Sequence, residues 1–247
     1  MTPRTRRAAR LGLARLLTVA ALTCTSVAML TGCSGVGRAL TGGQPGASAQ
    51  TDDTAEDDSP EGIVRSGQRG SGKFNVAQLS IPPAKRGSRV IRYVVRVEQG
   101  VPIKPNDAGR QIQAILDDPR GWKSTRTKPT AGSSFWLVSD PRDADFTISI
   151  AAPPTVDALC PLDTGGIWSC DDGQHVLINS DRWQFLTPTY SDPTAYRAYM
   201  INHEVGHFLG LGHAECAGAG LTAPVMMQQS KGLKGCVANP WPTRSNS

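Results

Sequence analysis

Three histidines and one glutamate lie together near the end of the chain, in the segment His203-Glu204-Val205-Gly206-His207-Phe208-Leu209-Gly210-Leu211-Gly212-His213. Helical residues four apart project one above the other, so His203 and His207 can reach the same ion. Glu204 is rotated by about 100° around the helix and can approach that ion without binding it. A glycine at position 210 suits the left-handed residue that ends a helix, and the turn can return His213 to the ion.

This spacing predicts a metal site built on a helix that ends in a sharp turn. Imidazole is a natural zinc ligand, and three protein ligands leave a fourth position open, which is typical of a catalytic zinc. We therefore expect one zinc ion bound by His203, His207 and His213, with Glu204 as the catalytic residue. The fourth histidine, His175, precedes a predicted strand, and we expect it to be incidental.

The helix that carries the first two histidines is predicted to run from Asp192 to Leu209. Asp192 is a favourable N-cap, and Pro193 follows at the position where its missing N–H costs least. An apolar stripe at helical spacing should face a sheet and leaves His203 and His207 outside it; it comprises Ile201, Val205, Phe208 and Leu209.

Upstream, alternating and apolar runs predict four strands and a second helix. The strands cover residues 89–97, 135–138, 145–150 and 176–179, with a short turn between the second and third. The helix is capped by Asn106 or Asp107 and is stopped by Asp118-Pro119. The order strand, helix, three strands, helix favours an α+β fold in which helices pack on a mixed sheet.

The first 32 residues have the parts of a secretory signal and are not expected to belong to the fold. An arginine-rich start precedes an apolar run from Leu16 to Leu30 and a small-residue region. Leu30-Thr31-Gly32-Cys33 is similar to a bacterial lipobox, so Cys33 is the expected lipidation site, at the extracytoplasmic face of the cell membrane. Ordinary secretion with an incidental Cys33, or a retained membrane helix, are the alternatives.

Charge and composition divide the rest of the chain. The formal charge of +5 comes from 26 basic and 21 acidic residues, and five arginines lie in the first 32 residues. Without them the balance is neutral, so we expect no nucleic-acid partner. Residues 33–72 are rich in glycine, serine and acidic residues, which predicts a disordered spacer. Residues 73–247 suffice for one domain, which we expect to be a monomer.

Four cysteines lie in the predicted domain, and an exported protein favours their pairing. We expect a Cys160–Cys170 and a Cys216–Cys236 disulfide, because each pair closes a short local loop. The alternative is that Cys216, three residues after His213, binds the metal and leaves Cys236 unpaired.

The metal motif resembles that of the metzincin metallopeptidases, H-E-x-x-H-x-x-G-x-x-H, which place a methionine-containing turn beneath the metal. The segment from Ala223 to Gln229 is similar to that turn, with Met226 as the expected methionine and Met227 as the alternative. The last 170 residues or so also resemble an actinobacterial family of exported proteins predicted to be metzincin-like zinc peptidases, in segments 179–183, 196–199, 223–229, 235–236 and 239–242.

The resemblance implies a twisted mixed sheet packed on a backing helix and an active-site helix, followed by a C-terminal subdomain with the methionine turn. It also implies a zinc metalloendopeptidase that hydrolyses peptides or proteins in the cell envelope or outside it. Glu204 would move the proton from water to the leaving amine. Substrate would add as a strand near residues 168–178, and acidification should weaken metal binding.

Two positions depart from familiar members of the clan. Gln228 stands where many of them have a tyrosine, and Ala214 follows the third histidine, so no oxyanion-stabilising residue is assigned. Two other functions fit the same motif. A noncatalytic zinc-containing envelope-binding lipoprotein is disfavoured by Glu204, which a structural site does not need. Hydrolysis of a nonpeptide amide remains open, because the motif acts only on a carbonyl.

Overall fold

The computed structural model describes residues 61–244 of the 247. The predicted signal segment, its lipidation site at Cys33 and the spacer up to residue 60 lie outside the described residues. Within the described range, no helix is both long enough and apolar enough to cross a membrane.

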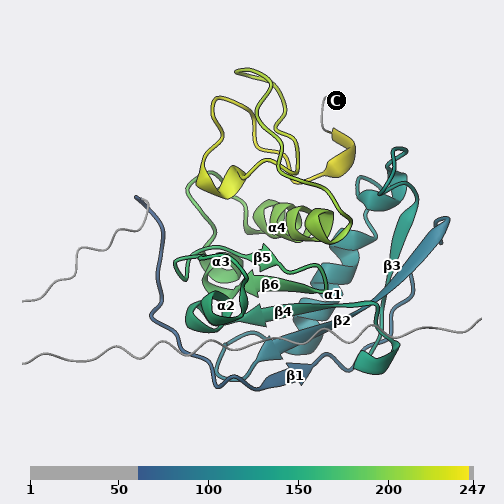
Figure 1. The fold of residues 1–247 in the computed structure, drawn as a ribbon, viewed down its shortest axis with the longest axis vertical. Helices are drawn as coiled ribbons and strands as arrows, with labels where there is room; N and C mark the ends of the chain where they lie inside the picture. The colour runs from purple at the N-terminus through teal and green to yellow at the C-terminus, as the bar shows by residue number, and fades with distance from the viewer. Residues whose placement is uncertain (1–60, 245–247) are drawn as a thin grey trace, which may run out of the picture. The chain divides into compact units, whose positions relative to one another are not determined.

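The fold is α+β, as predicted, with an open twisted mixed sheet and few helices (Figure 1). The strands are β1 (Phe74–Val76), β2 (Arg89–Glu98), β3 (Ser133–Leu137), β4 (Phe146–Ala151), β5 (Cys170–Asp171) and β6 (His175–Asn179). The helices are α1 (Pro105–Leu116), α2 (Pro153–Leu159), α3 (Ser180–Phe185) and α4 (Pro193–Phe208). All four strands and both helices predicted from the sequence are present, with ends shifted by a few residues.

The sheet has the strand order β1-β2-β4-β6-β5. β2, β4 and β6 are parallel, whereas β1 and β5 are antiparallel to their neighbours. Alternation along β6 separates the two faces: Val176 and Ile178 join the main core with α1 and α4, while Leu177 packs with Val156 of α2 on the other face. Because both faces are covered, the central strands are buried on both sides.

The short connection between β3 and β4 is not a hairpin. β3 pairs in parallel with the first half of β2 and β4 pairs in parallel with its second half. The Tyr93 carbonyl accepts from the Val138 N–H, and the Arg92 carbonyl accepts from the Asp145 N–H. Since successive carbonyls of a strand point to opposite edges, the connection carries the chain from one edge of β2 to the other.

Helix α1 begins earlier than predicted, and the expected caps are wrong. Lys104 occupies the N-cap without a side-chain hydrogen bond, and Pro105 is the first helical residue, which needs no N–H partner. Asn106 instead accepts from the Gln78 N–H at 2.8 Å, and Asp107 pairs with Arg110. Competition from these partners, which sequence alone does not show, explains the difference.

Residues 61–72 contact the domain although their composition predicts a spacer. The Ser66 N–H and hydroxyl donate to Asp181 at 2.8 and 2.6 Å. The Gly72 N–H donates at 2.7 Å to Glu98, a buried carboxylate that also accepts from the Ala152 N–H and the Thr155 hydroxyl. These bonds use backbone groups and small polar side chains, so hydrophobicity does not reveal them.

Candidate metal centre

Helix α4 brings the first two histidines of the motif into the centre of the domain. The Asp192 side chain caps it by accepting from the Thr194 N–H at 2.9 Å, as predicted. Ile201 and Val205 are fully buried, and Phe208 stacks on Phe146 at 4.1 Å between ring centroids. The buried surface extends beyond this predicted stripe and includes His203, because the C-terminal segment covers the other side of the helix.

The turn after α4 returns the third histidine. Gly210 adopts a φ of 92°, the left-handed conformation expected of it, and its N–H donates to the His207 carbonyl at 2.8 Å. The Ala214 N–H then donates to the Met226 carbonyl at 3.0 Å, which fixes the stretch of chain that carries His213. The three predicted ligands therefore converge.

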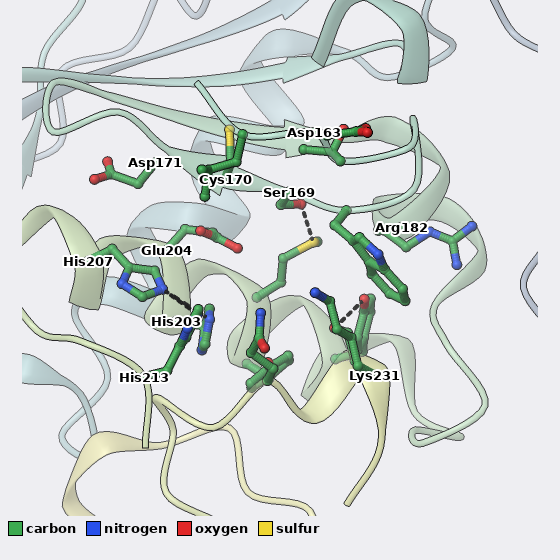
Figure 2. Close-up of a pocket in the computed structure, with 18 residues that line it drawn as sticks. Asp163, Ser169, Cys170, Asp171, Arg182, His203, Glu204, His207, His213 and Lys231 are labelled. Atoms are coloured by element: carbon green, nitrogen blue, oxygen red, sulfur yellow. Dashed lines mark hydrogen bonds between the residues drawn. The ribbon is translucent and has the colours of Figure 1, made fainter. Parts of the chain in front are cut away.

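The Nε2 nitrogens of the triad face one another (Figure 2). The Nε2 atom of His207 lies 3.3 Å from that of His203 and 3.1 Å from that of His213. One ring nitrogen of each residue lies within 4.8 Å of the others, an arrangement that can hold a metal ion.

The other ring nitrogens set the tautomers. Nδ1 of His203 lies 2.9 Å from the Val225 carbonyl oxygen, and Nδ1 of His207 lies 2.9 Å from the Leu211 carbonyl oxygen. A carbonyl only accepts, so each Nδ1 carries the hydrogen and each neutral ring directs the Nε2 lone pair towards the other histidines. Lone pairs so close repel unless a cation lies between them, and carbonyl partners of this kind orient metal-binding histidines.

Burial lowers the pKa of two histidines of the triad. The pKa of His203 is lowered to about 3, chiefly by burial and further by the charges of His207 and His213. The pKa of His213 is lowered by partial burial and then by its neighbours. A metal ion therefore has little competition from protons at His203 near neutral pH.

Glu204 is buried beside the triad, and no hydrogen bond within residues 61–244 engages its carboxylate. Burial, and then the charge of Asp171, raise the pKa of Glu204 to about 8. Asp171 belongs to β5, and its own pKa is raised, chiefly by burial. Its Oδ2 is buried without a hydrogen-bond partner in the described part of the chain. Two carboxylates thus lie beside the three histidines in one cavity.

Methionine 226 packs against α4 at Gly206, whereas Met227 does not. A Cβ on Gly206 would lie 2.2 Å from the Met226 sulfur. Met227 instead belongs to a separate cluster with Ala223 and the Cys216–Cys236 disulfide. The preceding residue, Val225, holds His203 through its carbonyl, so the predicted methionine turn and the metal centre are directly linked.

The triad opens into a cavity of about 360 Å³ (Figure 2). One wall is the edge strand β5 with the loop before it, and the opposite wall is the segment 228–231. The lining residues beyond the triad and Glu204 include Leu162, Asp163, Trp168, Ser169, Cys170, Asp171, Arg182, Tyr196, Met200, Ser230 and Lys231. Residues 168–171, part of the predicted substrate-binding segment, thus lie beside the metal centre.

Both predicted disulfides are formed, Cys160–Cys170 and Cys216–Cys236. The first closes the loop that leads into β5, and the second closes the segment that contains the methionine turn. Cys216 is therefore not a metal ligand. His175, expected to be incidental, lies outside the triad and contacts Asp172 at 2.9 Å.

Two residues of the site, Arg182 and Lys231, were not found from the sequence. They line the cavity but come from a short helix and a 3-10 turn, and neither segment has a periodic pattern. Trp168 and Asp171 fall inside the predicted substrate-binding segment 168–178, although the sequence did not single them out.

Comparison with known proteins gives a family and no curated relative. No curated protein matches the chain. A family model described as "Protein of unknown function (DUF3152)" matches residues 60–242, which include the whole sheet, the triad and the methionine turn. Because this match covers most of the 247 residues, the chain belongs to the DUF3152 family.

Proposed function

We propose that this protein is a zinc metalloendopeptidase of the metzincin type that hydrolyses peptide bonds outside the cytoplasm. The observation that carries the proposal is the position of Glu204. Its carboxylate is buried next to three convergent imidazoles, lines the cavity and has no hydrogen-bond partner in residues 61–244. A purely structural metal site gains nothing from such a group, whereas hydrolysis needs a base beside the metal.

The donor set supports zinc. Zn–N bonds of about 2.0–2.1 Å in tetrahedral geometry separate two ligand nitrogens by about 3.3 Å. The Nε2 separations of 3.3 Å between His203 and His207 and 3.1 Å between His207 and His213 fit that value. Three nitrogen ligands without a fourth protein ligand match a catalytic site.

The residues of the chain divide the chemistry between them. A bound zinc ion would supply Lewis acidity towards the scissile carbonyl and towards water. A carboxylate oxygen of Glu204 takes a proton from the attacking water and delivers it to the leaving nitrogen. Beside a cation held by the triad, the pKa of Glu204 would fall from about 8, so that its carboxylate would be ionised and could act as the base.

Strand β5 offers the place for an extended substrate. It pairs with β6 on one side and is the last strand in the order of the sheet, so its other edge has no strand partner within residues 61–244. A peptide that adds to this edge passes the triad, because Cys170 and Asp171 line the same cavity as His203 and His207. The signal-like leader and the two disulfides support an extracytoplasmic location, with Cys33 as the lipid anchor.

The test combines metal analysis with digestion. The full chain is loaded with zinc and incubated with a mixed peptide library, in parallel with Glu204→Gln and, as a control, Glu61→Gln at an exposed site far along the chain. Native protein and the control should bind one zinc and give the same cleavages. Glu204→Gln should bind zinc but cleave about 10²-fold to 10⁴-fold more slowly. Equal digests by native and Glu204→Gln protein would overturn the proposal.

A further inference from the structure

The cavity beside the triad has two chemically different ends (Figure 2). At one end lie the histidines, Glu204 and Asp171. At the other end lie two cationic side chains, Lys231 on the wall opposite Ser169, and Arg182 at the side of the cavity away from the histidines. The metal centre accounts for the first end, and nothing in the proposed hydrolysis uses the second.

Lys231 forms no ion pair with any residue in the range 61–244. Its ammonium lies 5.6 Å from the centre of the Trp168 ring, so it reaches across the cavity towards the opposite wall. No carboxylate of residues 61–244 lies within 4.0 Å of it.

Arg182 adds a second cation that is almost completely buried. Its terminal nitrogens donate to the carbonyls of Leu186 and Val64. Its Nε–H has no partner in the described residues. Burial lowers the pKa of Arg182, and the charge of Asp181 opposes that shift only in part. A buried guanidinium with an unused donor is costly, and an anion in the cavity relieves part of that cost.

The acidic groups of the cavity do not neutralise this end. Asp163 is exposed at the rim, where its carboxylate accepts from the Gly165 N–H at 2.9 Å. Asp171 and Glu204 lie at the metal end. The cavity is also lined by Trp168, Met200 and Leu162, apolar side chains that suit an aliphatic stem.

We propose that the cationic end of this cavity binds a carboxylate on the substrate residue next to the scissile bond, with Lys231 as the specificity-determining residue and Arg182 as a second cation that lines the same cavity. This inference rests on the proposed function and names its substrate class. The carboxylate is either an acidic side chain, glutamate in particular because of its apolar stem, or the free C-terminus of a short peptide. A volume of about 360 Å³ accommodates such a side chain together with bound water.

The decisive measurement is binding and does not depend on turnover. The full chain carrying Glu204→Gln is loaded with zinc and titrated with pairs of peptides. The two peptides of a pair differ only in having glutamate or glutamine at the residue after the scissile bond, which the library digest identifies. If no cleavage occurs, the pair is varied at each position in turn. One series has an amidated C-terminus and one a free C-terminus. An unpaired cation should favour the carboxylate peptide by about tenfold or more.

Variants then assign the preference to Lys231. Lys231→Met keeps the aliphatic stem and should remove most of the preference, whereas Lys231→Glu should reverse it. Lys234→Met removes the same charge three residues away, where the ammonium pairs with Glu215 at 2.6 Å outside the cavity, and should leave the preference intact.

The amidated and the free peptide series distinguish the two possible sources of the carboxylate. A preference for glutamate over glutamine in the amidated peptides identifies an acidic side chain. Tighter binding of the free series than of the amidated series, with glutamate and glutamine equal, identifies the chain end. The inference is overturned if glutamate and glutamine peptides bind equally and the free and amidated series also bind equally, if no peptide binds, or if the preference is unchanged in Lys231→Met. Cleavage without any acidic preference would leave the proposed peptidase function standing, and preferential binding without any cleavage would refute that function alone.

Discussion

The sulfur of Met226 occupies the space that a side chain on residue 206 would need. A Cβ built on Gly206 lies 2.2 Å from that sulfur, closer than atoms can approach, and 3.0 Å from the Trp122 ring. Since Gly206 lies between His203 and His207 on α4, the methionine turn is packed against the helix at the level of the metal centre. The glycine therefore permits the turn to approach the ligands from below.

Gly206→Ala should destabilise the protein although it improves helix propensity. Alanine is favoured over glycine in a helix by about 1 kcal/mol, so propensity alone predicts stabilisation. The clash with Met226 should reverse the sign and cost about 1–3 kcal/mol, as overpacking of a core does. Chemical denaturation measures the free energy of unfolding, and zinc titration measures the effect on the site.

Two controls make this result specific. Gly212→Ala changes a glycine of the same motif that has nothing within 4 Å of its Cβ position, so its unfolding free energy should change little. Adding Met226→Ala to Gly206→Ala should recover part of the loss, giving less than the sum of the single changes. Strict additivity would show that the methionine does not limit this position.

Zinc should stabilise the folded chain through the triad. The facing Nε2 atoms of His203, His207 and His213 repel one another in the absence of a cation, and an ion relieves that repulsion. At a free zinc concentration 100-fold above Kd the gain is about 2.7 kcal/mol. Differential scanning calorimetry with and without chelator should show it as a higher Tm.

The chain supplies a histidine control for this effect. His207→Ala should abolish the zinc-dependent rise in Tm. His175→Ala removes an exposed histidine that pairs with Asp172 and takes no part in the triad, so the full rise should remain. If His175→Ala loses the rise to the same extent, the ion binds elsewhere.

The residues that sequence reasoning placed correctly are those with strong local signals. Asp192 and Gly210 define the ends of α4 by capping chemistry, and the helix geometry then brings His203 and His207 together. The strands β2, β4 and β6 were found because alternating and apolar runs are local patterns, which can be recognised without knowledge of tertiary contacts. Pairing of the cysteines followed from short loops, for which few alternatives exist.

What sequence reasoning missed depends on distant contacts. Lys231, Trp168 and Arg182 meet in the cavity although each lies in a separate segment, and no pattern in one segment reports the others. β5 has only two residues, too few to show alternation. The passage of the chain across β2 between β3 and β4 is set by hydrogen bonds to Arg92 and Tyr93, so spacing alone predicts only a short connection.

The stability of the metal-free protein should depend on pH through Glu204. Its pKa is about 8 in the folded state, against an ordinary value of 4.5 when the chain is unfolded, so between these values the folded state binds more protons. The contribution of Glu204 to the free energy of unfolding is therefore fully present below about pH 4.5 and is lost as the pH rises towards 8. The slope is up to about 1.4 kcal/mol per pH unit.

Comparison with Glu204→Gln isolates this contribution from other titrating groups. The free energy of unfolding of the metal-free Glu204→Gln variant is subtracted from that of the metal-free native protein. This difference should fall steadily from about pH 4.5 to pH 8. Added zinc should flatten the difference, because the cation stabilises the ionised carboxylate in the folded state. A difference that is constant across this range without metal would show that Glu204 is not buried in a neutral form.

The two disulfides should affect different parts of the site. Removing Cys160–Cys170 by serine substitution opens the loop that carries Leu162 and Trp168 of the cavity, but no metal ligand. Chain entropy predicts a loss of about 3 kcal/mol in unfolding free energy, and the displaced cavity wall should weaken peptide binding. Zinc affinity, measured by competition with a chromophoric chelator, should stay close to that of native protein.

Serine substitution of Cys216 and Cys236 provides the matched comparison. It opens a loop of sequence separation 20 instead of 10, so the entropic loss is similar, about 3 kcal/mol. Here the loosened cluster contains Met227, two residues after the carbonyl that orients His203, so zinc affinity should fall. If both pairs of substitutions weaken zinc binding equally, the loop before β5 must support the ligands, and the cavity wall and the metal centre are not separate units.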